Sequence, residues 1–300
     1  MNKTLNKIKT EFHTTSRGIR QIDDFYVYKY ENEYGVALDN INDSKINESF
    51  SSVEIKNVEI NIGSGEIKKL LTLTTNLKTH KNEFASLCMQ FVEKGENSEN
   101  RELIINEPLK WWEKWKELIG NRMYNPAPYH VIAELLSLEI LYKNNEKGII
   151  WSGLIGSSVD LQSDNAKYEV KSSLVKYENE ITISSQFQLD LDREDQPEYL
   201  IFFKMEKMEN AETIDKVINR LKNYKSVIIE DIENKLHSFG YKEHSSTRNI
   251  SYVVHEIRKY KIDNNFPRIT KESFKGNKIP RNIKKITYTI NLDNLEYEIL

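Results

Sequence analysis

The chain has 300 residues, 38% hydrophobic and 30% charged, so it can bury a core and is not disordered in composition. Its 43 Lys and Arg against 46 Asp and Glu argue against a protein that coats nucleic acid by bulk charge. No stretch reaches the roughly 18 apolar residues of a membrane helix, and the single cysteine, Cys88, excludes a cysteine-cluster zinc site. We therefore expect a cytoplasmic protein with no membrane partner.

The first part of the chain predicts a basic arm and then a β-rich region. Residues 1–20 mix Lys and Arg with polar residues and contain no apolar signal-peptide core, which predicts a flexible arm. Short runs of Tyr, Phe, Val and Ile between Asn, Asp, Ser and Gly indicate antiparallel strands within residues 25–62. Helical spacing begins at Lys81, so residues 21–105 are expected to combine strands and helices.

Residues 106–300 predict a second domain. Trp111, Trp112 and Trp115 lie at helical spacing, and we interpret them as packing residues. A helix over about residues 128–143 is apolar on more than one face and is expected to be largely buried. The remaining expected elements are strands at 158–162, 167–172 and 181–185, helices at about 212–223 and 226–238, and strands near 251–254 and 286–292.

Three acidic residues and one lysine are spaced so that they can meet in this domain. Glu134 lies within the apolar helix, where a carboxylate is costly unless it is paired, hydrogen-bonded or bound to a cation. Glu169 and Lys171 are two positions apart in an expected strand and therefore project from the same face. Asp160 precedes Glu169 by a spacing that suits a turn to a neighbouring strand. Such carboxylates suit Mg²⁺, which prefers oxygen ligands and lowers the pKa of bound water.

The Glu-x-Lys triplet alone is a weak signal, because it also occurs at residues 54–56, 66–68 and 233–235. Only Glu169–Lys171 combines an upstream aspartate, an earlier helix glutamate and a following β-branched strand. The structural alternative is a salt-bridge ladder on a strand surface, which leaves Glu134 unexplained. His130 lies one helical turn before Glu134, and we favour a buried or supporting histidine over a metal ligand.

These residues resemble the PD-(D/E)xK core shared by many restriction endonucleases, with Val159 in place of the proline. More narrowly, the chain resembles a family of PD-(D/E)xK proteins encoded beside methyltransferases, ATPases and helicase-like proteins in bacterial restriction and phage-defence operons. The stretches that carry the resemblance are 133–139, 151–153, 160, 169–173, 183–185, 188–189, 266–269 and, more loosely, 111–118. The resemblance implies an α/β (α+β) fold, with a restriction-endonuclease-like core of mixed central β-sheet flanked by helices, beside an N-terminal β-rich region.

The resemblance also implies a catalytic set of Asp160, Glu169, Lys171, Glu134 and Gln188. Asp160 and Glu169 would be metal ligands, Glu134 an auxiliary carboxylate ligand, and Lys171 the residue that positions the attacking water. Gln188 would lie near the metal or the scissile phosphate, although Gln186 could exchange with it and a helix-capping role is an equal alternative. The implied cofactor is Mg²⁺, with Mn²⁺ as a substitute.

Double-stranded DNA is the expected partner. Ser172 and Ser173 are expected to hydrogen-bond the substrate backbone, and Arg268 and Arg281 in a basic C-terminal region to contact phosphates. Cleavage of both strands favours a homodimer or an assembly with an operon-encoded ATPase/helicase and methyltransferase. The expected function is a Mg²⁺-dependent DNA endonuclease of a restriction-modification or anti-phage defence system. The alternative is a non-catalytic DNA- or protein-binding subunit that keeps the nuclease scaffold.

Overall fold

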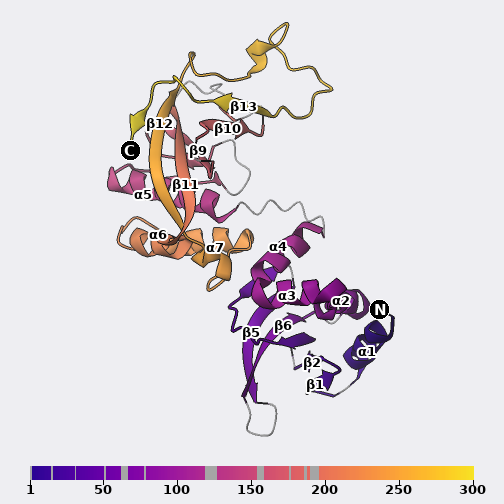
Figure 1. The fold of residues 1–300 in the computed structure, drawn as a ribbon. Helices are drawn as coiled ribbons and strands as arrows, with labels where there is room; N and C mark the ends of the chain where they lie inside the picture. Colours follow the sequence, from indigo (N-terminus) through magenta and orange to yellow (C-terminus); the bar gives the residue numbers. More distant parts are fainter. Residues whose placement is uncertain are drawn as a thin grey trace. The chain divides into compact units, whose positions relative to one another are not determined.

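The chain is divided into two compact units in a computed structural model (Figure 1). One unit comprises Met1–Tyr124 and Leu236–Thr247, and the other comprises Asn125–Lys235 and Arg248–Leu300. The structure describes residues 2–14, 16–30, 32–50, 52–61, 67–77, 79–118, 127–153, 159–175, 177–185, 188–189 and 196–300. The division differs from the expected boundary after residue 105, because residues 106–124 and 236–247 also belong to the first unit.

The first unit contains a six-stranded antiparallel sheet with the strand order β1-β2-β3-β6-β5-β4. Its strands alternate apolar and polar residues or carry β-branched and aromatic runs, which suit a pleated, half-buried surface. This sheet confirms the β-rich N-terminal region. The strands are β1 (Gly18–Ile22), β2 (Phe25–Lys29), β3 (Tyr34–Asp39), β4 (Asn47–Phe50), β5 (Val53–Asn61) and β6 (Ile67–Thr75).

Helices complete the core of the first unit. They are α1 (Asn2–His13), α2 (Lys81–Val92), α3 (Glu99–Asn106) and α4 (Pro108–Leu118). The expected flexible arm is wrong over residues 2–13, because Ile8 and Phe12 are four positions apart on α1 and both are fully buried. Trp111 and Trp112 of α4 are buried in the same cluster, which confirms their packing role and places α4 in the first unit.

The second unit is built on a six-stranded mixed sheet with the order β14-β12-β11-β9-β8-β7. Only the β9–β11 pair is parallel, and the other neighbouring pairs are antiparallel. The strands are β7 (Ile150–Trp151), β8 (Leu161–Gln162), β9 (Lys167–Ser173), β11 (Glu198–Glu212), β12 (Tyr252–Ile262) and β14 (Glu298–Ile299). This sheet and its helices confirm the predicted mixed α/β fold class.

Helices and a two-stranded sheet surround this mixed sheet. The apolar helix α5 (Pro128–Lys143) forms as predicted and contacts β9, β11 and α6 (Ile214–Leu221), as Figure 1 shows. The next helix, α7 (Ile229–Ser238), crosses the division between the units. The two-stranded sheet joins β10 (Glu180–Ile183) to β13 (Tyr288–Asn291). Apolar residues of β10 and β13 share one core cluster with residues of β11 and β12.

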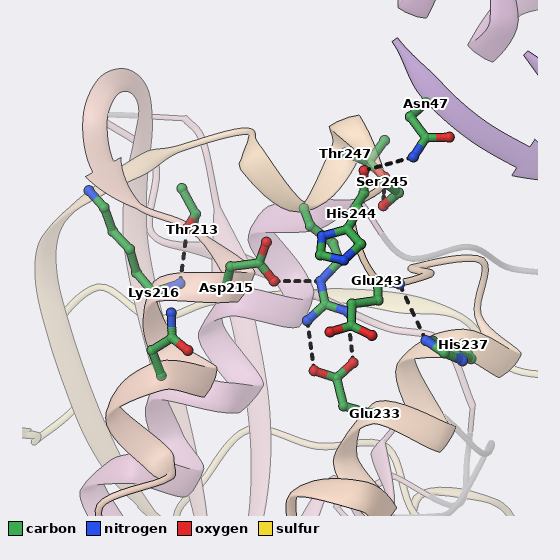
Figure 2. Close-up of polar contacts among 12 residues, drawn as sticks. Asn47, Thr213, Asp215, Lys216, Glu233, His237, Glu243, His244, Ser245 and Thr247 are labelled. Carbon is green, nitrogen blue, oxygen red and sulfur yellow. Dashed lines mark hydrogen bonds and ion pairs between the residues drawn. The ribbon is translucent and has the colours of Figure 1, made fainter. Parts of the chain in front are cut away.

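A buried arginine of the second unit connects a carboxylate on α6 with a carboxylate on α7. The guanidinium of Arg248 donates from Nε to Asp215 Oδ1 at 2.7 Å, and from its two terminal nitrogens to Glu233 at 2.7 and 2.9 Å. Figure 2 labels Asp215 on α6 and Glu233 on α7 and draws these contacts as dashed lines. Every nitrogen of the guanidinium therefore has a carboxylate acceptor.

None of the helices in the described ranges is long and apolar enough to cross a membrane.

Candidate active site

A tight turn between β8 and β9 brings Asp160 beside Glu169. The antiparallel register pairs Leu161 with Tyr168 and Gln162 with Lys167, so Asp160 and Glu169 directly flank the last pair of this ladder. The backbone N–H of Asp160 donates to the carbonyl of Tyr168 at 3.1 Å, and Asp160 Oδ2 accepts from the backbone N–H of Val170 at 2.7 Å. The position of Asp160 is thus fixed by both its main chain and its side chain, as the spacing predicts.

Glu169 and Lys171 project from the same face of β9 and form an ion pair. Lys171 Nζ lies 2.8 Å from Glu169 Oε1, and the amide nitrogen of Gln188 donates to the same oxygen at 2.9 Å. The Glu169 side chain is 1% exposed. Its other oxygen, Oε2, is buried and has no hydrogen-bond partner among the described residues. One oxygen therefore has two donors, and the other can accept a ligand.

Glu134 reaches the same region from α5. Its Oε2 accepts a 2.6 Å hydrogen bond from the indole nitrogen of Trp151 on β7. A β-carbon at Gly153 would lie 2.3 Å from Glu134 Oε2 and 2.9 Å from Asp160 Oδ1. Both carboxylates thus lie against one glycine, which is required at this position because any side chain would collide with them.

Burial and mutual repulsion raise the pKa values of all three carboxyl groups. Burial raises the pKa of Glu134 to about 7, although the Trp151 hydrogen bond opposes the shift, and the charge of Glu169 raises it further. The pKa of Asp160 is raised by burial and then by its two acidic neighbours. Burial also raises the pKa of Glu169, against the effect of Lys171. A bound cation would favour the ionised forms of these groups.

The donor set fits a hard divalent cation. Among the described residues, no group of three or more His, Cys, Asp or Glu side chains is arranged as a ready metal site. Mg²⁺ is usually held by only one or two carboxylates and keeps several waters, so such a group is not required. The unsatisfied Oε2 of Glu169 and the adjacent carboxylate of Asp160 are oxygen donors of the kind that this cation prefers.

The two serines that follow Lys171 have partners within the chain. Ser172 Oγ lies 2.8 Å from Nδ1 of His130, and Ser173 Oγ accepts from the backbone N–H of Val175 at 3.0 Å. Burial, together with the charge of Lys171, lowers the pKa of His130 to about 4, so the imidazole is neutral at pH 7. We therefore place His130 as a supporting residue, and DNA contacts by the serines stay a prediction.

The two predicted phosphate-binding arginines differ. Arg268 donates from a terminal nitrogen to the backbone carbonyl of Leu189 at 3.0 Å, beside Gln188. Arg281 has an exposed side chain, as a residue that meets DNA requires. Gln186, the alternative to Gln188, lies outside the described residues. DNA binding by either arginine stays a prediction.

Trp151 and Gly153 are the residues for which sequence reasoning assigned no role. They belong to a stretch that carries the family resemblance, 151–153, and that stretch was the available signal. Nothing in the spacing shows that an indole N–H meets Glu134 from a strand 17 positions later. The close approach at Gly153 depends on the positions of α5 and the β8–β9 turn together.

Comparison with protein-family models yields a match over most of the chain. A family model described as "Putative PD-(D/E)XK family member, (DUF4420)" matches residues 5–293. No curated protein and no solved structure matches the chain significantly. The match covers both units, and the second unit carries the Asp160, Glu169 and Lys171 pattern on a mixed sheet. The chain therefore belongs to the PD-(D/E)XK family DUF4420.

Proposed function

We propose that this protein is a Mg²⁺-dependent endonuclease that hydrolyses phosphodiester bonds of double-stranded DNA. The observation that carries the proposal is the meeting of three buried carboxylates with one lysine, where Glu169 Oε2 has no hydrogen-bond donor among the described residues. A salt-bridge ladder on a strand surface would leave its carboxylates solvated. The restriction-modification or anti-phage role and the cytoplasmic location belong to the same proposal.

Each side chain has a distinct task in this reaction. Asp160 and Glu169 would hold the cation, with Glu134 as the auxiliary carboxylate. The chemistry supplied by bound Mg²⁺, or by Mn²⁺ in its place, is a water of lowered pKa and a positive charge beside a phosphate oxygen.

Lys171 is 19% exposed, so its ammonium can orient the attacking water and stabilise the charge that develops on the phosphate. The amide of Gln188 holds Glu169 Oε1 and leaves Oε2 for the cation.

Plasmid cleavage with Mg²⁺ or Mn²⁺ tests the mechanism. Lys171→Ala is expected to lower the cleavage rate by roughly 10²- to 10³-fold, because a preorganised donor to the transition state is lost. Lys56→Ala is a matched control, since Lys56 Nζ also pairs with a glutamate two positions earlier, at 3.1 Å, on a strand of the first unit. That control is expected to cleave as the wild type does. Equal rates for wild type and Lys171→Ala would remove the mechanism.

The same assay distinguishes the endonuclease from the alternative, a non-catalytic DNA- or protein-binding subunit. A wild-type protein that binds duplex DNA and never cleaves it, even with its operon-encoded ATPase/helicase and methyltransferase, would be the non-catalytic subunit. Cleavage of both strands by one site per chain favours a homodimer on DNA. Light scattering of the DNA complex measures this stoichiometry.

A further inference from the structure

We propose that Arg268 is a positioning residue that holds Gln188 against Glu169 through the backbone carbonyl of Leu189. The inference rests on the proposed function, in which Glu169 is a metal ligand. It replaces the expected phosphate contact of Arg268 with a contact inside the protein.

Leu189 has a strained backbone. Its φ of +60° lies in the left-handed region, which a branched side chain rarely adopts and which costs on the order of 1 kcal/mol. Two contacts hold the residue there. Its side chain is 1% exposed within the core cluster shared by β10, β11, β12 and β13, and its carbonyl accepts from Arg268 at 3.0 Å. Because core packing and the bond from Arg268 together keep Leu189 in this conformation, we infer that the backbone of this turn has to keep its geometry.

That turn aims the amide of Gln188. Gln188 Oε1 accepts from the backbone N–H of Ser184 at 3.0 Å, which fixes which end of the amide is the oxygen. The amide nitrogen is thereby directed to Glu169 Oε1, 2.9 Å away. The orientation of Gln188 decides which carboxylate oxygen is occupied, and so which one stays available.

Arg268 is itself fixed on both sides along the chain. Phe266 is buried in the same core cluster, and the backbone N–H of Ile269 donates to the hydroxyl of Tyr288 on β13 at 3.2 Å. A guanidinium presented by such an anchored segment can hold a main-chain carbonyl at a set distance. The chain of contacts therefore runs from Arg268 through Leu189 and Gln188 to Glu169.

A phosphate contact and a positioning contact leave different signatures. A cation that neutralises a phosphate contributes about one unit to the slope of log affinity against log salt, and its loss weakens binding. A positioning residue leaves that slope unchanged and alters the rate on bound DNA. Arg268→Met removes every hydrogen-bond donor of the side chain, and Arg268→Lys keeps one charged donor group. Lys261→Met is the control for the loss of an exposed cation, because Lys261 lies exposed on β12.

The experiment measures cleavage of a saturating 30-base-pair duplex with Mn²⁺, and binding of the same duplex without divalent metal over a range of salt. We expect Arg268→Met to lower the rate by roughly 10- to 100-fold with the salt slope of the wild type. Arg268→Lys should recover part of that rate, and Lys261→Met should keep all of it. A slope reduced by about one, with an unchanged rate at saturation, would overturn the inference.

Two further measurements test the route through Gln188. The double variant Gln188→Ala/Arg268→Met should be no slower than Gln188→Ala alone, and rates that multiply would contradict the shared route. In metal-free ¹⁵N-labelled protein, Arg268→Met should shift the side-chain amide signals of Gln188, which Gln188→Ala identifies. Unmoved signals would refute the positioning role. Because this spectrum needs no cleavage, an inactive wild type would refute the proposed function and leave the test of Arg268 intact.

Discussion

The second unit contains two groups in which several carboxylates surround one cationic side chain. In one group the cation is the most deeply buried member, and in the other a carboxylate is. In the Arg248 group the cation is 1% exposed, while Asp215 and Glu233 are 37% and 23% exposed. In the candidate active-site group the Glu169 side chain is 1% exposed and the Lys171 side chain is 19% exposed. A buried arginine whose every nitrogen donates to a carboxylate stabilises the fold. Under the proposed function, the buried carboxylates outnumber their one nearby cation because they receive a second cation, and the partly exposed lysine meets the substrate.

The largest effect expected from this comparison is a loss of cleavage without a loss of stability. Glu169→Gln is expected to lower cleavage by roughly 10³-fold, because a ligand to the cation is replaced by a neutral amide. We also expect Mn²⁺ to raise the melting temperature of the wild type and not that of this variant. Without metal, its stability should equal or exceed that of the wild type, because a buried charge is removed.

Glu198→Gln is the matched control for that variant. Glu198 is a buried glutamate at the start of the neighbouring strand β11, outside the active-site group, and its variant should cleave normally. A fall of several kcal/mol in the stability of Glu169→Gln would instead identify a structural ion pair.

For the Arg248 group we expect the opposite result, a loss of stability. Arg248→Met should lower the free energy of unfolding by about 3 kcal/mol, because two carboxylates lose their shared buried partner. Urea denaturation measures this loss. The more exposed Arg220, which pairs with Glu139 and Glu212, provides the comparison, and Arg220→Met should cost under about 1 kcal/mol. Equal losses for the two variants would show that burial does not distinguish them.

A buried carboxylate in the first unit sharpens the comparison. Glu48 on β4 accepts from the backbone N–H and hydroxyl of Thr247 at 2.7 and 3.2 Å. Burial raises its pKa to about 7, and Glu113 adds to the shift while Thr247 and Lys116 oppose it.

The folded protein therefore binds a proton on Glu48 that the unfolded chain releases above about pH 4.5. This contribution to stability is complete below that pH and is lost as the pH rises through about 7. The difference in stability between wild type and Glu48→Gln should thus change by about 3 kcal/mol between pH 4.5 and 8, measured by urea denaturation. A pH-independent difference would contradict the shift.

The parts of the site that depend on short-range spacing could be predicted from the sequence. Glu169 and Lys171 share a face because strand side chains alternate, and a tight turn returns Asp160 to Glu169. The apolar helix around Glu134 was also predictable, because its apolar residues recur through the whole segment.

Contacts between distant segments could not be predicted. Arg268 reaches Leu189 across 79 positions, and Arg248 reaches Asp215 across 33. The strand β11 carries apolar residues in its first half and exposed charged residues in its second, so no single period marks its 15 residues. The amphipathic helix α1 was missed because its few buried residues are spread among lysines and polar residues.

The hydrogen bond between Trp151 and Glu134 has a practical consequence. The chain has four tryptophans, and the other three, Trp111, Trp112 and Trp115, all lie on α4 in the first unit. The second unit thus has a single indole fluorophore, and its N–H is bonded to a carboxylate of the candidate active site. Replacing the three α4 tryptophans with phenylalanine would let emission spectroscopy follow events at that carboxylate alone, in real time and without a label.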